Sequence, residues 1–274
     1  MPQFVTDDGV RIVYQMWNRP TVLPPLVLHH GFTGCATCDW VETGVVAALT
    51  AASRTVIAPD ARGHGGSDKP HQPSAYGEAR MARDLTQLID ALAVPQIDLV
   101  GFSMGAVVAL LAATTDQRIR RLAIVGVGAG VVELGGVDRP ALPPDVLAAA
   151  LVADDPTAIE DPAAAAFRTN AEARGADLMA LAAHAQAIHA TAIPLHRIIA
   201  PTLVLAGDAD PFAERPEVLA SAIPRAQLTI LAGDHGTAIT NPQFVARVID
   251  FNGGRLSRDV TDRRTTDHRL RPPP

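Results

Sequence analysis

The chain contains little of what marks several large classes of protein. Its 274 residues include two cysteines and only 4% aromatic side chains, and the formal net charge is −6. The acidic balance gives no support to nucleic acid or an anionic membrane as a partner. No apolar run is long enough to span a bilayer, and the first residues lack the basic and then apolar segments of a signal peptide. We therefore expect a cytoplasmic protein with neither nucleic-acid nor membrane partners.

The two cysteines lie in one segment, Cys35-Ala36-Thr37-Cys38. A structural zinc site needs about four ligands, and the chain has no second cysteine pair to complete one. A thioredoxin-like dithiol belongs to a different βαβ context. We therefore expect two thiols in a loop or a first helical turn, sensitive to oxidants at most.

Apolar residues make up 48% of the chain, enough for a large core. An alternating run over 10–16 follows the turn signal Asp8-Gly9 and predicts an antiparallel hairpin with the residues before it. Nearly continuous apolar runs predict the strands of a parallel sheet covered on both faces; they lie at 25–30, 54–58, 97–100, 122–125, 202–206 and 228–231. Between these runs, apolar residues recur at helical spacing, as in 79–92. Strands that alternate with helices predict an α/β fold: a doubly wound, mostly parallel sheet of eight strands with an N-terminal antiparallel strand.

One long segment interrupts this alternation. From about 131 to 199 no strand is predicted, and Asp155-Pro156 and Asp161-Pro162 are helix-start signals. We expect a helical lid over the carboxyl edge of the sheet, where open α/β sheets bind ligands. The predicted division is a core of 1–130 and 200–251, a lid of 131–199, and a disordered tail of 252–274, which is polar, mostly basic and without period. The alternative for the tail is an arm that binds nucleic acid or a membrane.

The segment Gly101-Phe102-Ser103-Met104-Gly105 lies between the apolar run 97–100 and a longer one at 106–111. Strand, sharp turn and helix in this order predict a nucleophile elbow. The two glycines let the strand and the helix approach closely. The serine hydroxyl then lies at a helix N-terminus, where partial positive charge favours a developing anion. Taken alone, the motif also fits a glycine-rich βα turn of a nucleotide-binding unit.

Two later strand ends supply the base and the acid that a serine nucleophile needs. Gly207-Asp208-Ala209-Asp210 follows one predicted strand, and Gly233-Asp234-His235 follows the next. Both loops leave the carboxyl ends of strands, as Ser103 does, so the three groups should meet at one edge of the sheet. Asp208 is the alternative acid. Asp234 adjoins the histidine, and because neighbouring side chains diverge we expect it to be structural.

With these motifs the chain resembles the α/β-hydrolase fold superfamily over about residues 3 to 251. His30-Gly31-Phe32 is similar to the oxyanion loop of that family, and the segment 59–68 to its D-x-R-G-x-G-x-S turn. The resemblance implies that Asp210 is the acid and His235 the base. It also implies an oxyanion hole formed by the backbone N–H groups of Phe32 and Met104. The chain departs from many relatives at Ala106, where they carry glycine, and at Gly236, where they carry a large apolar residue.

The implied activity is that of a carboxylesterase-like serine hydrolase. Ser103, deprotonated by His235, would attack a carboxylic ester, lactone or thioester of a small molecule, with no metal or organic cofactor. The alternatives on this fold are a carbon–carbon bond hydrolase, an enol-lactonase and a cofactor-free perhydrolase or haloperoxidase-like enzyme. A non-catalytic ligand-binding protein is the alternative from another class. Serine at the elbow argues against epoxide hydrolases and dehalogenases, which use aspartate there. The oligomeric state is left open.

Several further polar and aromatic residues are candidates for the site. Asp60, Arg62 and His64 are expected to stabilise the turn that supports the oxyanion loop, with contact to substrate as the alternative. His29 and His30 are expected at a strand end, with backbone partners. His184 and His189 are five residues apart, so they point about 140° apart on a helix and form no metal pair. For Trp40 and Phe102, core packing is the expectation and pocket lining the alternative.

Overall fold

The apolar runs form one mixed sheet in the computed structural model, which describes residues 1–19, 21–138 and 142–253. The strand order is β1-β2-β4-β3-β5-β6-β7-β8; β1 with β2 and β2 with β4 are antiparallel, and the other described neighbours are parallel. The strands are β1 (Gln3–Val5), β2 (Arg11–Trp17), β3 (Leu26–His29), β4 (Val56–Pro59), β5 (Ile97–Phe102), β6 (Ile119–Val125), β7 (Thr202–Gly207) and β8 (Ala226–Leu231). The predicted fold class is confirmed.

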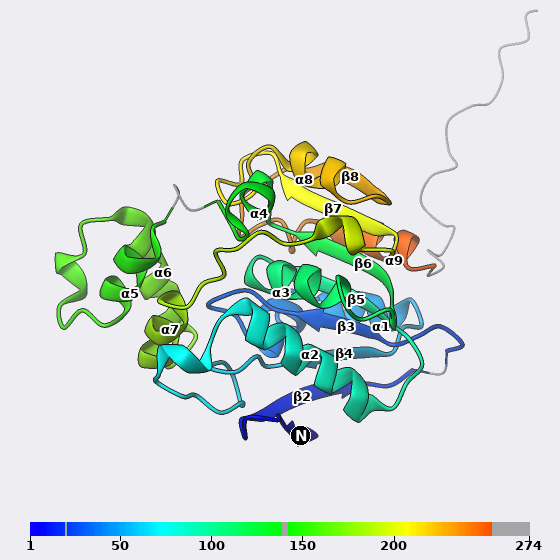
Figure 1. The fold of residues 1–274 in the computed structure, drawn as a ribbon, viewed down its shortest axis with the longest axis horizontal. Coiled ribbons are helices and arrows are strands. Elements are labelled where there is room, and N and C mark those ends of the chain that lie inside the picture. Colours follow the sequence, from blue (N-terminus) through cyan, green and yellow to red (C-terminus); the bar gives the residue numbers. More distant parts are fainter. Residues whose placement is uncertain (20, 139–141, 254–274) are drawn as a thin grey trace, which may run out of the picture.

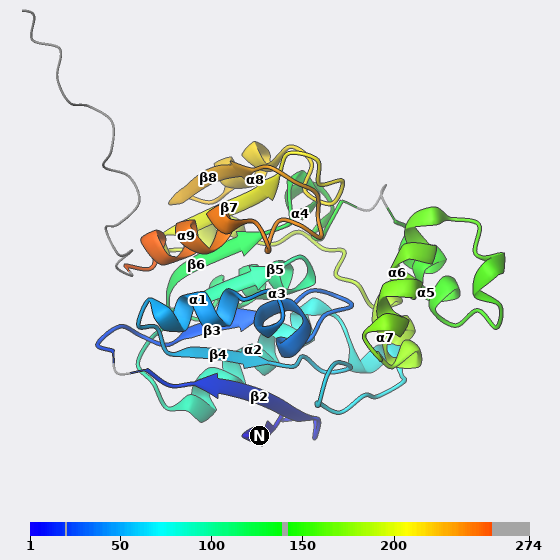
Figure 2. The same cartoon turned by 180° about the vertical axis from the view of Figure 1, so that it is seen from behind.

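Helices cover both faces of this sheet, and each face has its own apolar cluster. In Figure 1, α2 (Glu78–Leu92), α3 (Met104–Ala113) and α8 (Pro216–Ala222) lie on the near face. Figure 2, from behind, shows α1 (Val45–Ala51) and α9 (Pro242–Phe251) on the other face. Neighbouring residues of a strand point to opposite faces, so Leu99 packs in the first cluster and Val100 in the second. Burial on both faces explains why the central strands are apolar without alternation.

The segment between β6 and β7 is helical in its described part, and no strand occurs there. It contains α4 (Ala129–Leu134), α5 (Pro144–Leu151), α6 (Pro162–Ala173) and α7 (Leu178–Ala185), and the short turns η4 (Pro156–Ala158) and η5 (Leu195–Arg197). We call α5, α6 and α7 the cap helices; they lie beside the sheet in Figures 1 and 2. Asp161 and Asp177 cap the N-termini of α6 and α7 by accepting backbone N–H groups.

The predicted tail lies outside the described residues except for Asn252 and Gly253. The division of the chain into core, lid and tail stays a prediction. Among the described helices, none is long and apolar enough to cross a membrane.

The prediction of two free thiols is wrong, because Cys35 and Cys38 form a disulfide. Their position in a first helical turn is as expected, at the start of the π-helix η1 (Ala36–Val41). The turn brings their Cα atoms to 5.1 Å, which is within the range that a disulfide spans. The spacing rules for zinc and thioredoxin-like sites do not cover a cross-link between two cysteines of one helical turn.

A buried charge cluster lies at the amino ends of the central strands, on the side away from the elbow. Asp98 of β5 and Arg54, which precedes β4, have fully buried side chains, with Nη2 of Arg54 2.7 Å from Oδ2 of Asp98. Arg120 of β6 donates from Nε and Nη2 to the same carboxylate at 2.9 and 2.6 Å. Arg54 also donates to the carbonyl oxygens of Pro24 and Asn252. The cluster therefore links three strands to the end of α9.

Replacing Asp98 by alanine tests this cluster. The change leaves the buried Arg54 guanidinium without its counter-charge, so we expect the free energy of unfolding to fall by about 3–5 kcal/mol in denaturant titrations. Arg11 and Asp68 form an exposed pair, with side chains 37% and 43% exposed, and Arg11→Ala as the control should cost about 0–1 kcal/mol. An Asp98→Ala variant as stable as the parent would contradict this role for Asp98.

Candidate active site

The serine of the G-x-S-x-G segment occupies a strained turn between β5 and α3. Ser103 has φ 54° and ψ −115°, a backbone conformation that non-glycine residues rarely adopt. A Cβ atom on Gly101 would overlap the carbonyl oxygen of Gly105, and one on Gly105 would overlap that of His29. The two glycines therefore let the strand and helix come close enough to form the turn. The Ser103 hydroxyl makes no capping bond to α3, which leaves it free to face the sheet edge.

The predicted acid and base lie beside this hydroxyl. Nε2 of His235 is 2.9 Å from Oγ of Ser103, and Nδ1 is 2.9 and 3.0 Å from the two carboxylate oxygens of Asp210. An ionised carboxylate only accepts hydrogen bonds, so Nδ1 carries the proton and Nε2 accepts from the serine hydroxyl. The Asp210 side chain is fully buried and also accepts the N–H of Phe212. The structure thus brings together three residues that are far apart in the chain.

Asp208, the alternative acid, and Asp234, expected to be structural, have other partners. Asp208 accepts the backbone N–H of Gly233 at 2.9 Å and so joins the acid loop to the histidine loop. Asp234 accepts the N–H and the hydroxyl of Thr237 at 2.9 and 2.7 Å. Both carboxylates therefore stabilise the loops that carry Asp210 and His235.

Of the predicted oxyanion donors, Met104 directly follows Ser103 at the start of α3, and Phe32 lines the same cavity as Ser103. Within the described residues, neither backbone N–H donates a hydrogen bond. Met104 is the first residue of α3, where an N–H has no acceptor inside the helix. The Phe32 loop turns at Gly34, whose N–H donates to the carbonyl of Gly31 at 3.0 Å. Both amides are therefore available to an additional acceptor.

The turn at 59–68 is hydrogen-bonded to the oxyanion loop, His30-Gly31-Phe32, and to the segment that follows it. Nε2 of His64 lies 2.6 Å from the carbonyl oxygen of Phe32. Asp60 accepts the N–H groups of Ala36 and Gly66, both at 2.8 Å. Arg62 pairs with Asp8 and Asp84, away from the serine. These contacts agree with a supporting role for the turn.

Histidines are buried under the same loop. Nε2 of His30 accepts the N–H of Ala61 at 2.9 Å, and its Nδ1 donates to the carbonyl of Gly31 at 2.8 Å. Burial lowers the pKa of His29 and of His64 to about 4, and it lowers the pKa of His30 well below 6.5. His184 is also buried, in α7, with Nε2 3.7 Å from Glu78. In the described part of the chain, no group of three or more His, Cys, Asp or Glu side chains is arranged to hold a metal ion.

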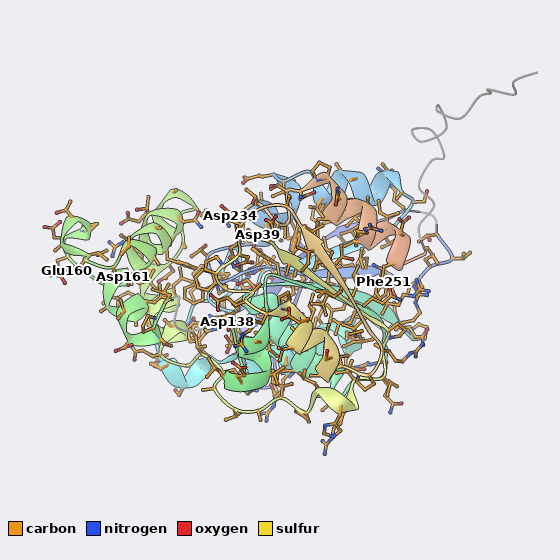
Figure 3. All side chains as sticks on the ribbon, turned by 90° about the horizontal axis from the view of Figure 1, so that it is seen from above. Asp39, Asp138, Glu160, Asp161, Asp234 and Phe251 are labelled. Atoms are coloured by element: carbon orange, nitrogen blue, oxygen red, sulfur yellow. A yellow bond between two sulfur atoms is a disulfide. The ribbon has the colours of Figure 1, made fainter. Side chains whose placement is uncertain are left out.

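A cavity of about 410 Å³ opens above Ser103 and His235. Its apolar lining comes from Phe32, Phe102, Phe167, Phe212 and Ile239, and its polar lining includes Thr33, Asp39, Asn170, Arg174 and Thr240. Phe102 therefore lines the cavity as well as packing in the core, whereas Trp40 is fully buried beside Phe244. Figure 3 shows Asp39 and Asp234 on the side of the sheet that faces the cap helices.

Sequence reasoning missed the cavity residues of the cap and the carboxylate opposite them. Phe167, Asn170 and Arg174 come from α6 and its C-terminal end, and Asp39 comes from η1. No motif marks them. The signal that existed was the capping residue Asp161, which marks where α6 begins, but no spacing rule says which face of that helix meets the sheet edge or what lies opposite.

Comparisons with known proteins place the chain among relatives of similar architecture. A family model for the alpha/beta hydrolase fold matches residues 24–193. A 2-hydroxymuconate semialdehyde hydrolase from Pseudomonas sp. (strain CF600) is 39% identical over 108 residues, which is 39% of this chain and 37% of that protein. The chain therefore matches well under two thirds of that relative's length.

Solved structures match over nearly the whole chain. A hydrolase from Pseudomonas aeruginosa PA01 has a TM-score of 0.75 and 29% identity, over 92% of this chain and 98% of that one. The enol-lactonase from Burkholderia xenovorans LB400 has a TM-score of 0.73 and 23% identity, over 91% and 99%. At 23% identity, the match to the enol-lactonase supports only the fold.

The buried histidines predict how stability depends on pH. The folded-state pKa values of His29, His30 and His64 lie below the unfolded value of about 6.5, so the unfolded chain binds more protons between about pH 6.5 and 4. The free energy of unfolding is therefore highest above pH 6.5 and falls on acidification, by up to about 1.4 kcal/mol per pH unit for each histidine. Thermal denaturation at stepped pH measures this slope. His29→Asn should flatten it, the exposed His196→Asn should not, and equal slopes in both variants would refute the assignment.

Proposed function

The chain belongs to the α/β-hydrolase fold family, and we propose that it is a serine hydrolase that cleaves ester-like bonds of a small molecule through an acyl-enzyme. The observation that carries the proposal is the hydrogen-bonded series Asp210, His235 and Ser103, with its serine at a helix N-terminus under a cavity of about 410 Å³. A cavity of this size and mostly apolar lining suits a small organic substrate.

In the proposed reaction, Oγ of Ser103 attacks the carbonyl carbon while Nε2 of His235 takes the hydroxyl proton. Asp210 stabilises the imidazolium and keeps the ring in its reactive tautomer. The carbonyl oxygen becomes an oxyanion that accepts the N–H groups of Phe32 and Met104. His235 then protonates the leaving oxygen as the C–O bond breaks. Water, deprotonated by the same nitrogen, attacks the acyl-enzyme and releases the acid and free Ser103.

The charges around the cavity favour a neutral ester. Arg174 lies against Asp39, with Nη1 2.7 Å from Oδ1, so these two charges compensate each other. A carboxylated substrate would have to draw Arg174 away from a carboxylate that is only 2% exposed, which leaves a buried charge unpaired. Neutral carboxylic esters and lactones avoid that cost.

A second candidate is hydrolysis of a carbon–carbon bond in an unsaturated keto acid. It is favoured by the relative that is 39% identical and is named for 2-hydroxymuconate semialdehyde, which carries a carboxylate. The same serine, histidine and aspartate would serve, with the carboxylate taken up at Arg174.

Removing the nucleophile or its acid tests the mechanism. We expect Ser103→Ala to lower kcat/KM for a p-nitrophenyl ester at least about 10⁴-fold and to abolish covalent labelling by a fluorophosphonate, mapped by mass spectrometry. Asp210→Asn should lower kcat about 10⁴-fold because the histidine takes the wrong tautomer.

The chain supplies matched controls for both changes. Ser221 is an exposed serine of α8, and Asp208 lies two residues before the acid and binds backbone only. Ser221→Ala and Asp208→Asn should stay within about threefold of the parent. Labelling at a serine other than Ser103, or equal losses in Asp208→Asn and Asp210→Asn, would sink the assignment.

A substrate panel separates the two candidate activities. We expect neutral short-chain p-nitrophenyl esters to have kcat/KM at least about tenfold higher than esters of the same length that carry a free carboxylate. A dienoic keto acid, followed by its absorbance, is the third arm. Faster turnover of the keto acid than of every neutral ester would favour the second candidate.

A further inference from the structure

Asp39 is a buried carboxylate that the reaction described above does not use. Its side chain is 2% exposed, and its Oδ2 accepts the backbone N–H of Gly31 at 2.9 Å. A Cβ atom on Gly34 would overlap the same carboxylate. Gly31 and Gly34 of the loop that carries the Phe32 amide therefore lie against this carboxylate. The Phe32 N–H belongs to the peptide that joins Gly31 to Phe32, so a contact at Gly31 affects its orientation.

The position of Asp39 is fixed by its own short helix. Its N–H donates to the carbonyl of Cys35 at 3.0 Å, and its carbonyl accepts the hydroxyl of Thr43 at 2.7 Å. Both backbone groups of Asp39 are therefore hydrogen-bonded, which fixes the point from which its carboxylate reaches the oxyanion loop.

The counter-charge of Asp39 comes from the cap helices. Arg174, at the C-terminal end of α6, places Nη1 2.7 Å from Oδ1 of Asp39. One turn earlier on the same helix, Nδ2 of Asn170 donates to the hydroxyl of Thr33 at 2.8 Å. The residues of both contacts line the same cavity as Phe32. Helix α6 is thus joined to the loop directly at Thr33, and through Asp39 at Gly31.

An unpaired carboxylate at this place would act against the proposed reaction. The tetrahedral oxyanion forms beside the Phe32 amide, and a second negative charge on Asp39, buried against the adjoining Gly31 amide, would repel it. The cost of burying that charge would also push the carboxylate towards solvent, away from the Gly31 amide. Pairing with the Arg174 guanidinium offsets both effects, since Asp39 then has its counter-charge and keeps its place against the Gly31 amide.

We propose that Arg174 is a positioning residue: by neutralising Asp39 from the cap, it fixes the Gly31–Phe32 peptide in the orientation that stabilises the oxyanion. The inference rests on the proposed serine hydrolase function. On this proposal, the oxyanion hole is complete only when α6 packs against the loop, so the cap helices contribute to the chemical step as well as to substrate choice.

The test replaces Arg174 by methionine, which keeps much of the side-chain length and removes the charge. With a neutral p-nitrophenyl ester, we expect kcat to fall about 10- to 100-fold, part of the effect of losing one oxyanion donor, while KM changes less than about threefold. Fluorophosphonate labelling of Ser103 should slow by a similar factor, because the phosphoryl oxygen uses the same donors. Arg174→Lys keeps the charge and should recover most of the activity.

Two further variants distinguish positioning from simple loss of stability. Arg118 is 33% exposed and lies 2.7 Å from the buried Asp116, as Arg174 is 32% exposed and lies 2.7 Å from Asp39. Arg118→Met should therefore lower the melting temperature and leave kcat unchanged. The double variant Asp39→Asn with Arg174→Met keeps an acceptor for Gly31 without the charge, so it should be at least about fivefold faster than Arg174→Met alone.

The outcomes separate this inference from the function on which it rests. If the parent is labelled at Ser103 but Arg174→Met keeps its kcat, the proposed function stands and the positioning role is wrong. If Arg174→Met changes only KM, and only for carboxylated esters, Arg174 binds substrate directly and the positioning role is again overturned. If the parent itself hydrolyses no ester and reacts with no fluorophosphonate, the proposed function fails first.

Discussion

The left-handed backbone of Ser103 is the constraint on which the candidate site depends. A non-glycine residue at φ 54° costs about 1–3 kcal/mol, and the cost is met by packing around it. Strand β5 lies inside the sheet, between β3 and β6, and is buried along its whole length. Gly101 and Gly105 let α3 press against it. Because of this turn, the serine hydroxyl is free of the helix and faces the histidine loop.

Three buried carboxylates, Asp98, Asp210 and Asp39, show how the two edges of the sheet differ. At the amino ends of the strands, Asp98 is shared by two arginines and joins strands together. At the carboxyl ends, Asp210 meets the histidine that faces the serine, and Asp39 meets an arginine from the cap. In a low-dielectric interior each charge needs its partner. The amino edge therefore serves stability, and the carboxyl edge carries the groups proposed for chemistry.

Much of the fold could be predicted because its signals are local. The central strands are apolar without alternation, because both faces of the sheet are covered. Asp161 marks the start of α6, because its side chain caps the helix N-terminus. The site residues Ser103, Asp210 and His235 were predictable because each follows a strand at a turn rich in glycine. The disulfide between Cys35 and Cys38 was missed, although the two are three residues apart, because only the turn of η1 sets the distance between them.

Patterns in the sequence were enough to predict the family, the succession of strands along the chain and the residues that meet at the carboxyl edge of the sheet. Hydrophobic periodicity and turn chemistry involve residues that are only a few positions apart, so they are visible in the sequence. Which cap residues face that edge depends on the packing of the folded chain. Arg174 and Asp39 are 135 positions apart, and their pairing follows from how α6 packs over the oxyanion loop. No local pattern encodes that packing, because it depends on shapes and charges contributed by both partners at once.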